Sequence, residues 1–137
     1  GCKMKYLLDT HILIWYFKGN EKLSDENRSI IEKRQNEIYY SPLSIYEIDN
    51  KRAKHPDKMP EIGEEIIALC QKTGIKVLPF NEKHALELVN LKRYENTPPH
   101  NDPFDKMMLC QAIAENMLFM THDNRIAEYD TPNIYKV

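Results

Sequence analysis

The amino-acid sequence predicts an α/β fold, a three-layer α/β/α sandwich around a central parallel sheet of four or five strands. Short apolar segments rich in β-forming residues alternate along the chain with amphipathic segments of about ten residues or more, which is typical of a parallel sheet covered on both faces. The length of 137 residues and the hydrophobic content of 42% suit a single domain with one core. We expect this domain to span residues 4–137, and residues 1–3 to be a non-native extension before it.

The N-terminal part of the chain predicts a strand, two helices and a second strand. Residues 5–8 form a short apolar run that is typical of a strand, and apolar residues recur at helical spacing over residues 11–18. Ser24 is a suitable N-cap for a second helix over residues 25–35. Residues 38–40 are too few for a helix and are rich in β-formers, which predicts the next strand.

Two helices and a strand are predicted in the middle of the chain. Ser41, which is followed by a proline, is a favourable helix start and predicts a helix over residues 42–54. A second amphipathic segment covers residues 61–72, and Gly74 lies just past its end, where a C-cap glycine is expected. Residues 75–78 then predict a third strand.

The C-terminal part predicts two further helices and two strands. Residues 82–94 form an amphipathic segment, and a polar loop follows it. Asp102 is a good N-cap and Pro103 suits the first position of a helix, because proline lacks the N–H that would have no partner there. Residues 118–120 are all apolar, which suits a strand buried on both faces, and residues 134–137 predict a last edge strand.

Charge and composition limit the possible functions. A net charge of −2 gives no overall basic field, so composition alone does not suggest sequence-independent nucleic-acid binding. A basic run over residues 51–58 is most simply a solvated helix end. Cys2, Cys70 and Cys110 include no Cys-x-x-Cys pair, so we expect reduced thiols. No apolar run approaches the roughly 20 residues that cross a bilayer, and we see no secretory signal pattern. We therefore expect a cytoplasmic protein.

Four carboxylates fall at comparable places in the predicted fold. Asp9 ends the first strand, Glu47 lies within the helix after the second strand, Asp105 lies in the first turn of the helix that begins at Pro103, and Asp123 follows a strand. Right-handed crossovers place the carboxyl ends of parallel strands on the same side of the sheet, where ligands gather. Carboxylates packed together repel each other unless a cation lies among them. Mg²⁺ and Mn²⁺ both accept such oxygen ligands.

Several of these acids also have a structural explanation. Asp102 is most simply a helix cap. Asp105 is favoured by the helix dipole, and Asp123 alone could be a turn or cap residue. His11 and His100 lie close to the acids in the sequence, as does His122. Each of the three follows a strand or lies in a loop, so solvent exposure is a sufficient explanation and we do not assign them a catalytic role.

The sequence also resembles a known family, the PIN domain. The segments that carry the resemblance occur in the family's order and spacing: LLDTH at 7–11, SIYE at 44–47, DPFD at 102–105, CQA at 110–112 and THD at 121–123. The chain is most similar to the ribonuclease toxins of bacterial and archaeal toxin–antitoxin pairs, the VapC-like group, and the resemblance covers nearly the whole chain from Met4.

The resemblance implies a catalytic site whose residues also bind Mg²⁺ or Mn²⁺. These are Asp9, Glu47, Asp105 and Asp123. The residues implied to support this site are Thr10, Asp102 and Thr121. The candidates for contact with RNA phosphates are Lys51, Arg52 and Lys106. The first two follow the site glutamate on the same predicted helix, and the third stands where many relatives have arginine.

The function implied by the resemblance is metal-dependent hydrolysis of RNA phosphodiesters by the toxin of a toxin–antitoxin pair, with a homodimer and an antitoxin protein as partners. One alternative is a catalytically silent PIN-like module that binds RNA or protein. Loss of an acid would indicate that state, and all four acids are present. A phosphatase of the haloacid-dehalogenase type also has an aspartate after its first strand. Its motif needs a second aspartate two residues later, where this chain has His11.

Overall fold

A single parallel sheet organises the protein. The computed structural model describes residues 3–137, so Gly1 and Cys2 of the expected extension lie outside the described residues. Within residues 3–137, five strands form one sheet in the order β3-β2-β1-β4-β5, and every neighbouring pair is parallel. The strands are β1 (Lys5–Leu8), β2 (Glu37–Tyr40), β3 (Lys76–Val77), β4 (Leu118–Thr121) and β5 (Ile134–Lys136).

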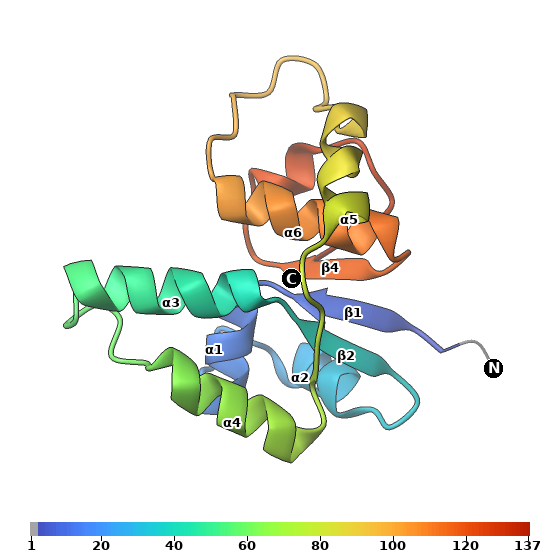
Figure 1. Ribbon diagram of the computed structural model, residues 1–137. Helices are drawn as coiled ribbons and strands as arrows, with labels where there is room; N and C mark the ends of the chain where they lie inside the picture. The colour runs from blue at the N-terminus through green and yellow to red at the C-terminus, as the bar shows by residue number, and fades with distance from the viewer. Residues whose placement is uncertain (1–2) are drawn as a thin grey trace.

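Helices cover both faces of this sheet. Figure 1 shows α5 and α6 on one face and α1, α2 and α4 on the other. The α-helices are α1 (Thr10–Lys18), α2 (Asp25–Glu32), α3 (Pro42–Lys54), α4 (Gly63–Thr73), α5 (Glu82–Leu86) and α6 (Pro103–Ala114). The 3₁₀ helices are η1 (Glu87–Asn90) and η2 (Ile126–Glu128). The six α-helices of the described residues and the five-strand parallel sheet confirm the predicted α/β fold.

The central strands are apolar on both sides because each side has a hydrophobic core to cover. Successive side chains of a strand point to opposite faces. Leu8 packs into the core formed with α1, α2 and α4, whereas Leu7 packs into the core formed with α6. Phe119 and Met120 of β4 divide in the same way, and all four side chains are 0% exposed. This double burial explains the continuous apolar runs in β1 and β4.

The prediction of one long helix over residues 82–94 is wrong. The α-helix ends at Leu86, the 3₁₀ helix η1 follows, and η1 contains no buried residue. A helix is stabilised mainly by packing of its apolar face, and the later turns of this segment have no such packing. Arg93 instead forms an isolated antiparallel bridge with Tyr129, which holds the chain extended.

Two helix boundaries also differ from the prediction. Helix α2 ends at Glu32, and the Asn36 side-chain amide donates to the Ile30 carbonyl just beyond that end. Helix α4 begins at Gly63, whose N–H donates to Asp49 Oδ1 at 2.8 Å. A Cβ atom at Gly63 would lie 2.8 Å from the Asp49 carboxylate, so this close approach of α3 and α4 requires glycine. Among the helices of residues 3–137, none is long and apolar enough to cross a membrane.

Candidate active site

Five acidic side chains line one cleft at the carboxyl ends of β1 and β4. They are Asp9, Glu47, Asp102, Asp105 and Asp123. The cleft has a volume of about 400 Å³, and Lys22 and Lys51 also line it. It lies where the strand order changes direction along the sheet, between β1 and β4, which is the usual place for a ligand in an open parallel sheet. The four acids predicted from the sequence as site residues therefore share one cleft.

Asp9 is held at the bottom of the cleft by two hydrogen bonds. Its Oδ1 accepts from the Ile12 N–H at 2.8 Å, so Asp9 is the N-cap of α1, and the helix begins at Thr10 rather than at residue 11 as predicted. Its Oδ2 accepts from Thr121 Oγ1 at 2.5 Å. The side chain is only 4% exposed. Burial raises the pKa of Asp9, although both hydrogen bonds oppose that shift.

Glu47 faces the same cleft from α3. It is 5% exposed, and its Oε1 accepts from Thr10 Oγ1 at 2.6 Å. Its Oε2 forms an ion pair with Lys51 Nζ at 3.1 Å, one turn along the helix. The buried position of Glu47 in the middle of a helix therefore has a specific cause: the carboxylate is directed toward Asp9 and its neighbours in the cleft, and Lys51 balances its charge.

Asp105 and Asp123 lie close together in the cleft. The pKa of Asp105 is raised to about 9, mainly by burial, and the hydrogen bond with Asp123 and the charges of Asp102 and Asp9 contribute to this shift. For Asp123 burial also acts to raise the pKa, but the groups around it, chiefly the hydrogen bond with Asp105, outweigh burial, and its pKa is lowered. The opposite shifts favour one shared proton on the two carboxyl groups near neutral pH.

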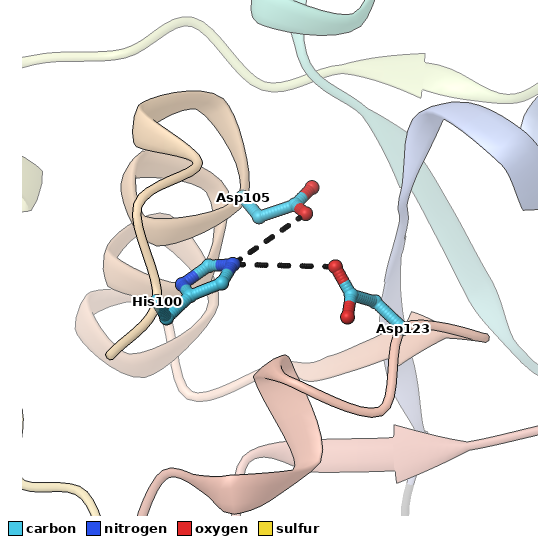
Figure 2. Close-up of side chains that lie close together, drawn as sticks. All are labelled: His100, Asp105 and Asp123. Atoms are coloured by element: carbon cyan, nitrogen blue, oxygen red, sulfur yellow. Dashed lines mark ion pairs between the residues drawn. The ribbon is translucent and has the colours of Figure 1, made fainter. Parts of the chain in front are cut away.

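His100 is a site residue that the sequence did not reveal. It was expected to be exposed, yet it is only 6% exposed and burial lowers its pKa. Its Nδ1 lies 3.1 Å from Tyr129 Oη. Its Nε2 points between Asp105 and Asp123, at 3.9 Å and 4.0 Å from their Oδ2 atoms (Figure 2). The loop before α6 has no periodic pattern, and Tyr129, which contacts His100, is distant in sequence. The only sequence signal for a site residue here was the position of His100 two residues before the helix cap Asp102.

Four of the remaining predicted residues lie at the cleft or hold its side chains in place. Asp102 caps α6 as predicted, and its Oδ1 accepts from the Phe104 and Asp105 N–H groups at 2.9 and 3.2 Å. Thr10 and Thr121 hold the carboxylates of the cleft, as described above, and Lys51 lines it.

Two of the basic residues expected to contact RNA lie elsewhere, because Arg52 and Lys106 are not among the cleft-lining residues. Lys106 borders a separate groove beside α5. Lys22 lies in the cleft instead, with its ammonium 5.7 Å from the centre of the Trp15 ring, and no sequence pattern had indicated it.

The donor set of the cleft fits a divalent cation. Among the described residues, one group has a ligand atom from each member within 4.8 Å of the others: His100, Asp105 and Asp123. The Nε2 atom of His100 is buried and has no hydrogen-bond partner within residues 3–137. Asp9 and Glu47 line the same cleft but are outside this tight group, and neighbouring hydroxyl groups hold their oxygens. Several carboxylates and an unpartnered imidazole nitrogen are appropriate ligands for a divalent metal ion.

The raised pKa of Asp105 predicts a pH-dependent stability of the metal-free protein. In the unfolded chain Asp105 loses its proton near pH 3.8, whereas in the folded protein it keeps the proton up to about pH 9. The folded state therefore binds the extra proton, and the free energy of unfolding falls as pH rises through this window, by at most about 1.4 kcal/mol per pH unit. Urea unfolding in EDTA at pH 7, 8 and 9, above the titration range of histidine, measures this dependence. The free energy of unfolding should fall less steeply with pH for Asp105→Asn than for the parent protein. Equal slopes in the two proteins would contradict the shift.

The sheet order and the acidic cleft at the strand ends together define an α/β protein of the PIN-like class. The PIN domain model matches residues 6–132, and the chain belongs to this family. The resemblance stated from the sequence is therefore confirmed. Among curated proteins, no match to the chain was found.

Similar solved structures are complexes of the VapBC type. VapBC2 from Rickettsia felis, bound to a DNA fragment from its promoter, has a TM-score of 0.64 at 19% identity, covering 98% of each chain. VapBC-1 from nontypeable Haemophilus influenzae has a TM-score of 0.60 at 21% identity, covering 97% of this chain and 98% of that one. DNA-bound VapBC from Salmonella typhimurium has a TM-score of 0.59 at 20% identity, covering 98% and 97%.

Proposed function

We propose that this chain is a metal-dependent endoribonuclease that hydrolyses RNA phosphodiesters and acts as the toxin of a toxin–antitoxin pair. The observation that carries the proposal is the gathering of Asp9, Glu47, Asp105 and Asp123 in one cleft at the strand ends. Membership of the PIN domain family supports it, and so does the similarity to VapBC complexes. A catalytically silent module, the alternative considered from the sequence, would not need all four acids.

In this proposal the four acids hold Mg²⁺ or Mn²⁺. A bound divalent cation lowers the pKa of a water molecule and neutralises charge on the phosphoryl oxygens in such a hydrolysis. Asp105 and Asp123 are the carboxylates closest to each other, and Asp105 must give up its proton to serve as a ligand. Asp9 and Glu47, which line the same cleft, contribute directly or through water.

The threonines of the cleft position these carboxylates. Thr121 donates to Asp9 and Thr10 donates to Glu47, so each acid keeps one fixed orientation. Such supporting hydrogen bonds typically affect metal affinity or activity by about 10- to 100-fold. Asp102 supports the site indirectly, because it caps the helix whose first turn carries Asp105.

The lysines of the cleft are the candidates for contact with the RNA backbone. The side chain of Lys51 is 42% exposed although it pairs with Glu47. It can therefore also reach a phosphate at the mouth of the cleft. Lys22 lines the same cleft. Arg52 and Lys106 would then contact RNA only outside the cleft.

The proposed partners are an antitoxin protein and a second copy of the chain. The solved structures similar to this chain are VapBC complexes, and the inference to this chain is by analogy of fold. We propose that the protein acts in the cytoplasm, where such an RNA substrate occurs.

RNA cleavage tests the proposal. The purified protein should cleave single-stranded RNA in the presence of Mg²⁺ or Mn²⁺ and lose this activity in excess EDTA. Calcium should support the reaction poorly because its looser coordination positions the attacking water less well. Asp105→Asn protein, purified identically, controls for a contaminating ribonuclease. Robust cleavage in EDTA, or equal cleavage by this variant, would refute the proposed function.

A further inference from the structure

The imidazole of His100, which lies beside the cleft carboxylates of Asp105 and Asp123, has one nitrogen that is buried without a partner among the described residues. The side chain is 3% exposed and comes from the loop that precedes α6. Its Nε2 has no hydrogen-bond partner in the described residues. A buried polar atom without a partner is unfavourable by about 1–3 kcal/mol and calls for a physical explanation.

The ring is held in a fixed orientation. His100 Nδ1 lies 3.1 Å from the hydroxyl of Tyr129, and the two rings pack edge to face with centroids 5.6 Å apart. The Arg93 guanidinium in turn covers the Tyr129 ring at 4.7 Å and pairs with Glu128 at 2.6 Å. When Nδ1–H donates to Tyr129, Nε2 carries a lone pair. A histidine that binds a metal usually has its second nitrogen anchored in this way.

The direction of Nε2 points to a cation between the three side chains. The distances of 3.9 Å to Asp105 and 4.0 Å to Asp123 are too long for hydrogen bonds. Two donors that bind one ion at about 2.1 Å can be at most about 4.2 Å apart, so both distances are compatible with a shared ion. Figure 2 shows the nitrogen and the two carboxylates directed toward the same space.

We infer that His100 is a nitrogen ligand of a divalent cation bound with Asp105 and Asp123, and that it makes this position favour a first-row transition-metal ion over Mg²⁺. This inference rests on the metal-dependent function proposed above and adds a ligand and a metal class to it. Imidazole binds transition-metal ions well, whereas Mg²⁺ prefers oxygen ligands and retains its waters. Asp9 and Glu47, which line the same cleft outside the tight group, offer oxygen only.

The alternative is that a protonated His100 forms ion pairs with the two acids. In that case Nε2–H would approach a carboxylate oxygen to about 2.7–2.9 Å, as charge-assisted hydrogen bonds do. Neither measured distance comes near this value. Burial of the ring also disfavours its charged form.

Pulsed electron paramagnetic resonance of the Mn²⁺-loaded protein tests the inference. A directly bound imidazole produces a ¹⁴N coupling to Mn²⁺, which we expect in the parent and not in His100→Gln. The matched control is the His11→Gln/His122→Gln double variant, because both residues line the same cleft outside the tight group. It should keep the coupling. A parent without nitrogen coupling, or a double variant that loses it, would overturn the inference even if His100→Gln does not fold.

Metal titrations give a second measurement. His100→Gln should weaken Mn²⁺ binding by about 10-fold or more and change Mg²⁺ binding by less than about 3-fold. Tyr129→Phe should retain the nitrogen coupling and weaken Mn²⁺ binding to a smaller extent. Equal losses for the two ions in His100→Gln would indicate a general structural role and overturn the selectivity. If Mn²⁺ binds without nitrogen coupling and RNA is still cleaved, this inference fails alone. If no divalent ion binds, the proposed function fails with it.

Discussion

Replacing Asp105 by asparagine is expected to lower RNA cleavage by at least about 100-fold while the metal-free folded state at pH 7 is at least as stable as the parent. The large loss follows because Asp105 belongs to the tight ligand group, and asparagine is a weaker metal ligand than a carboxylate. Stability in EDTA should stay level or rise because the parent must take up a proton on Asp105 to fold at pH 7, where its pKa is raised to about 9, whereas asparagine is neutral in both states. Initial cleavage rates and melting temperatures measure the two effects.

Asp102→Asn is the matched control for this substitution. Asp102 lines the same cleft and has the same side chain, but its Oδ1 caps α6. Asparagine is nearly as good an N-cap as aspartate. The control should therefore cost much less activity than Asp105→Asn. If the two variants lose activity equally, the effect comes from the net charge of the cleft, and Asp105 is not a specific ligand.

Divalent metal should stabilise the parent protein, and Asp9→Asn should lose most of this gain. A ligand that binds only the folded state at a hundredfold excess over its Kd contributes about 2.7 kcal/mol. This corresponds to a rise in melting temperature of roughly 3 °C per kcal/mol for a domain of this size. Thermal unfolding with 5 mM EDTA or with a saturating concentration of Mg²⁺ or Mn²⁺ makes the comparison.

The metal-free melting temperature of Asp9→Asn should stay level or rise. The carboxylate is buried, so removal of its charge relieves an unfavourable burial. The asparagine oxygen can still accept from the Ile12 N–H, and its amide can donate to Thr121 Oγ1. A clear drop in metal-free stability together with intact cleavage would show that Asp9 is a structural cap without a catalytic role.

The sequence predicted the fold well where burial imposes a simple pattern. The apolar runs of β1 and β4 and the cap-plus-proline starts of α3 and α6 depend on neighbouring residues only, and the structure has them where they were predicted. The long helix over residues 82–94 failed because most of its apolar residues are not covered by another part of the chain. Val89, for example, is 84% exposed. A helical pattern cannot show whether another part of the chain will cover it.

The candidate site was predictable to the extent that topology fixes it. The positions of Asp9 and Asp123 after parallel strands were sufficient to place both in one cleft. His100 and Lys22 were missed because each belongs to a loop. Tyr129 holds His100, and Trp15 lies beside Lys22. Such contacts depend on tertiary packing that no local spacing encodes.

The hydrogen bond between Asp9 and Thr121 has a consequence for synthesis of the protein. It joins residues 112 positions apart, and the two neighbours of β1 in the sheet come from opposite halves of the chain. Contacts of such long range form late in folding because a large loop must close first. A nascent chain still on the ribosome and ending before β4 has Asp9 and Glu47 but lacks Thr121 and Asp123. The complete cleft therefore forms only after nearly the whole chain has been translated, so an unfinished chain beside the translation machinery does not yet carry it.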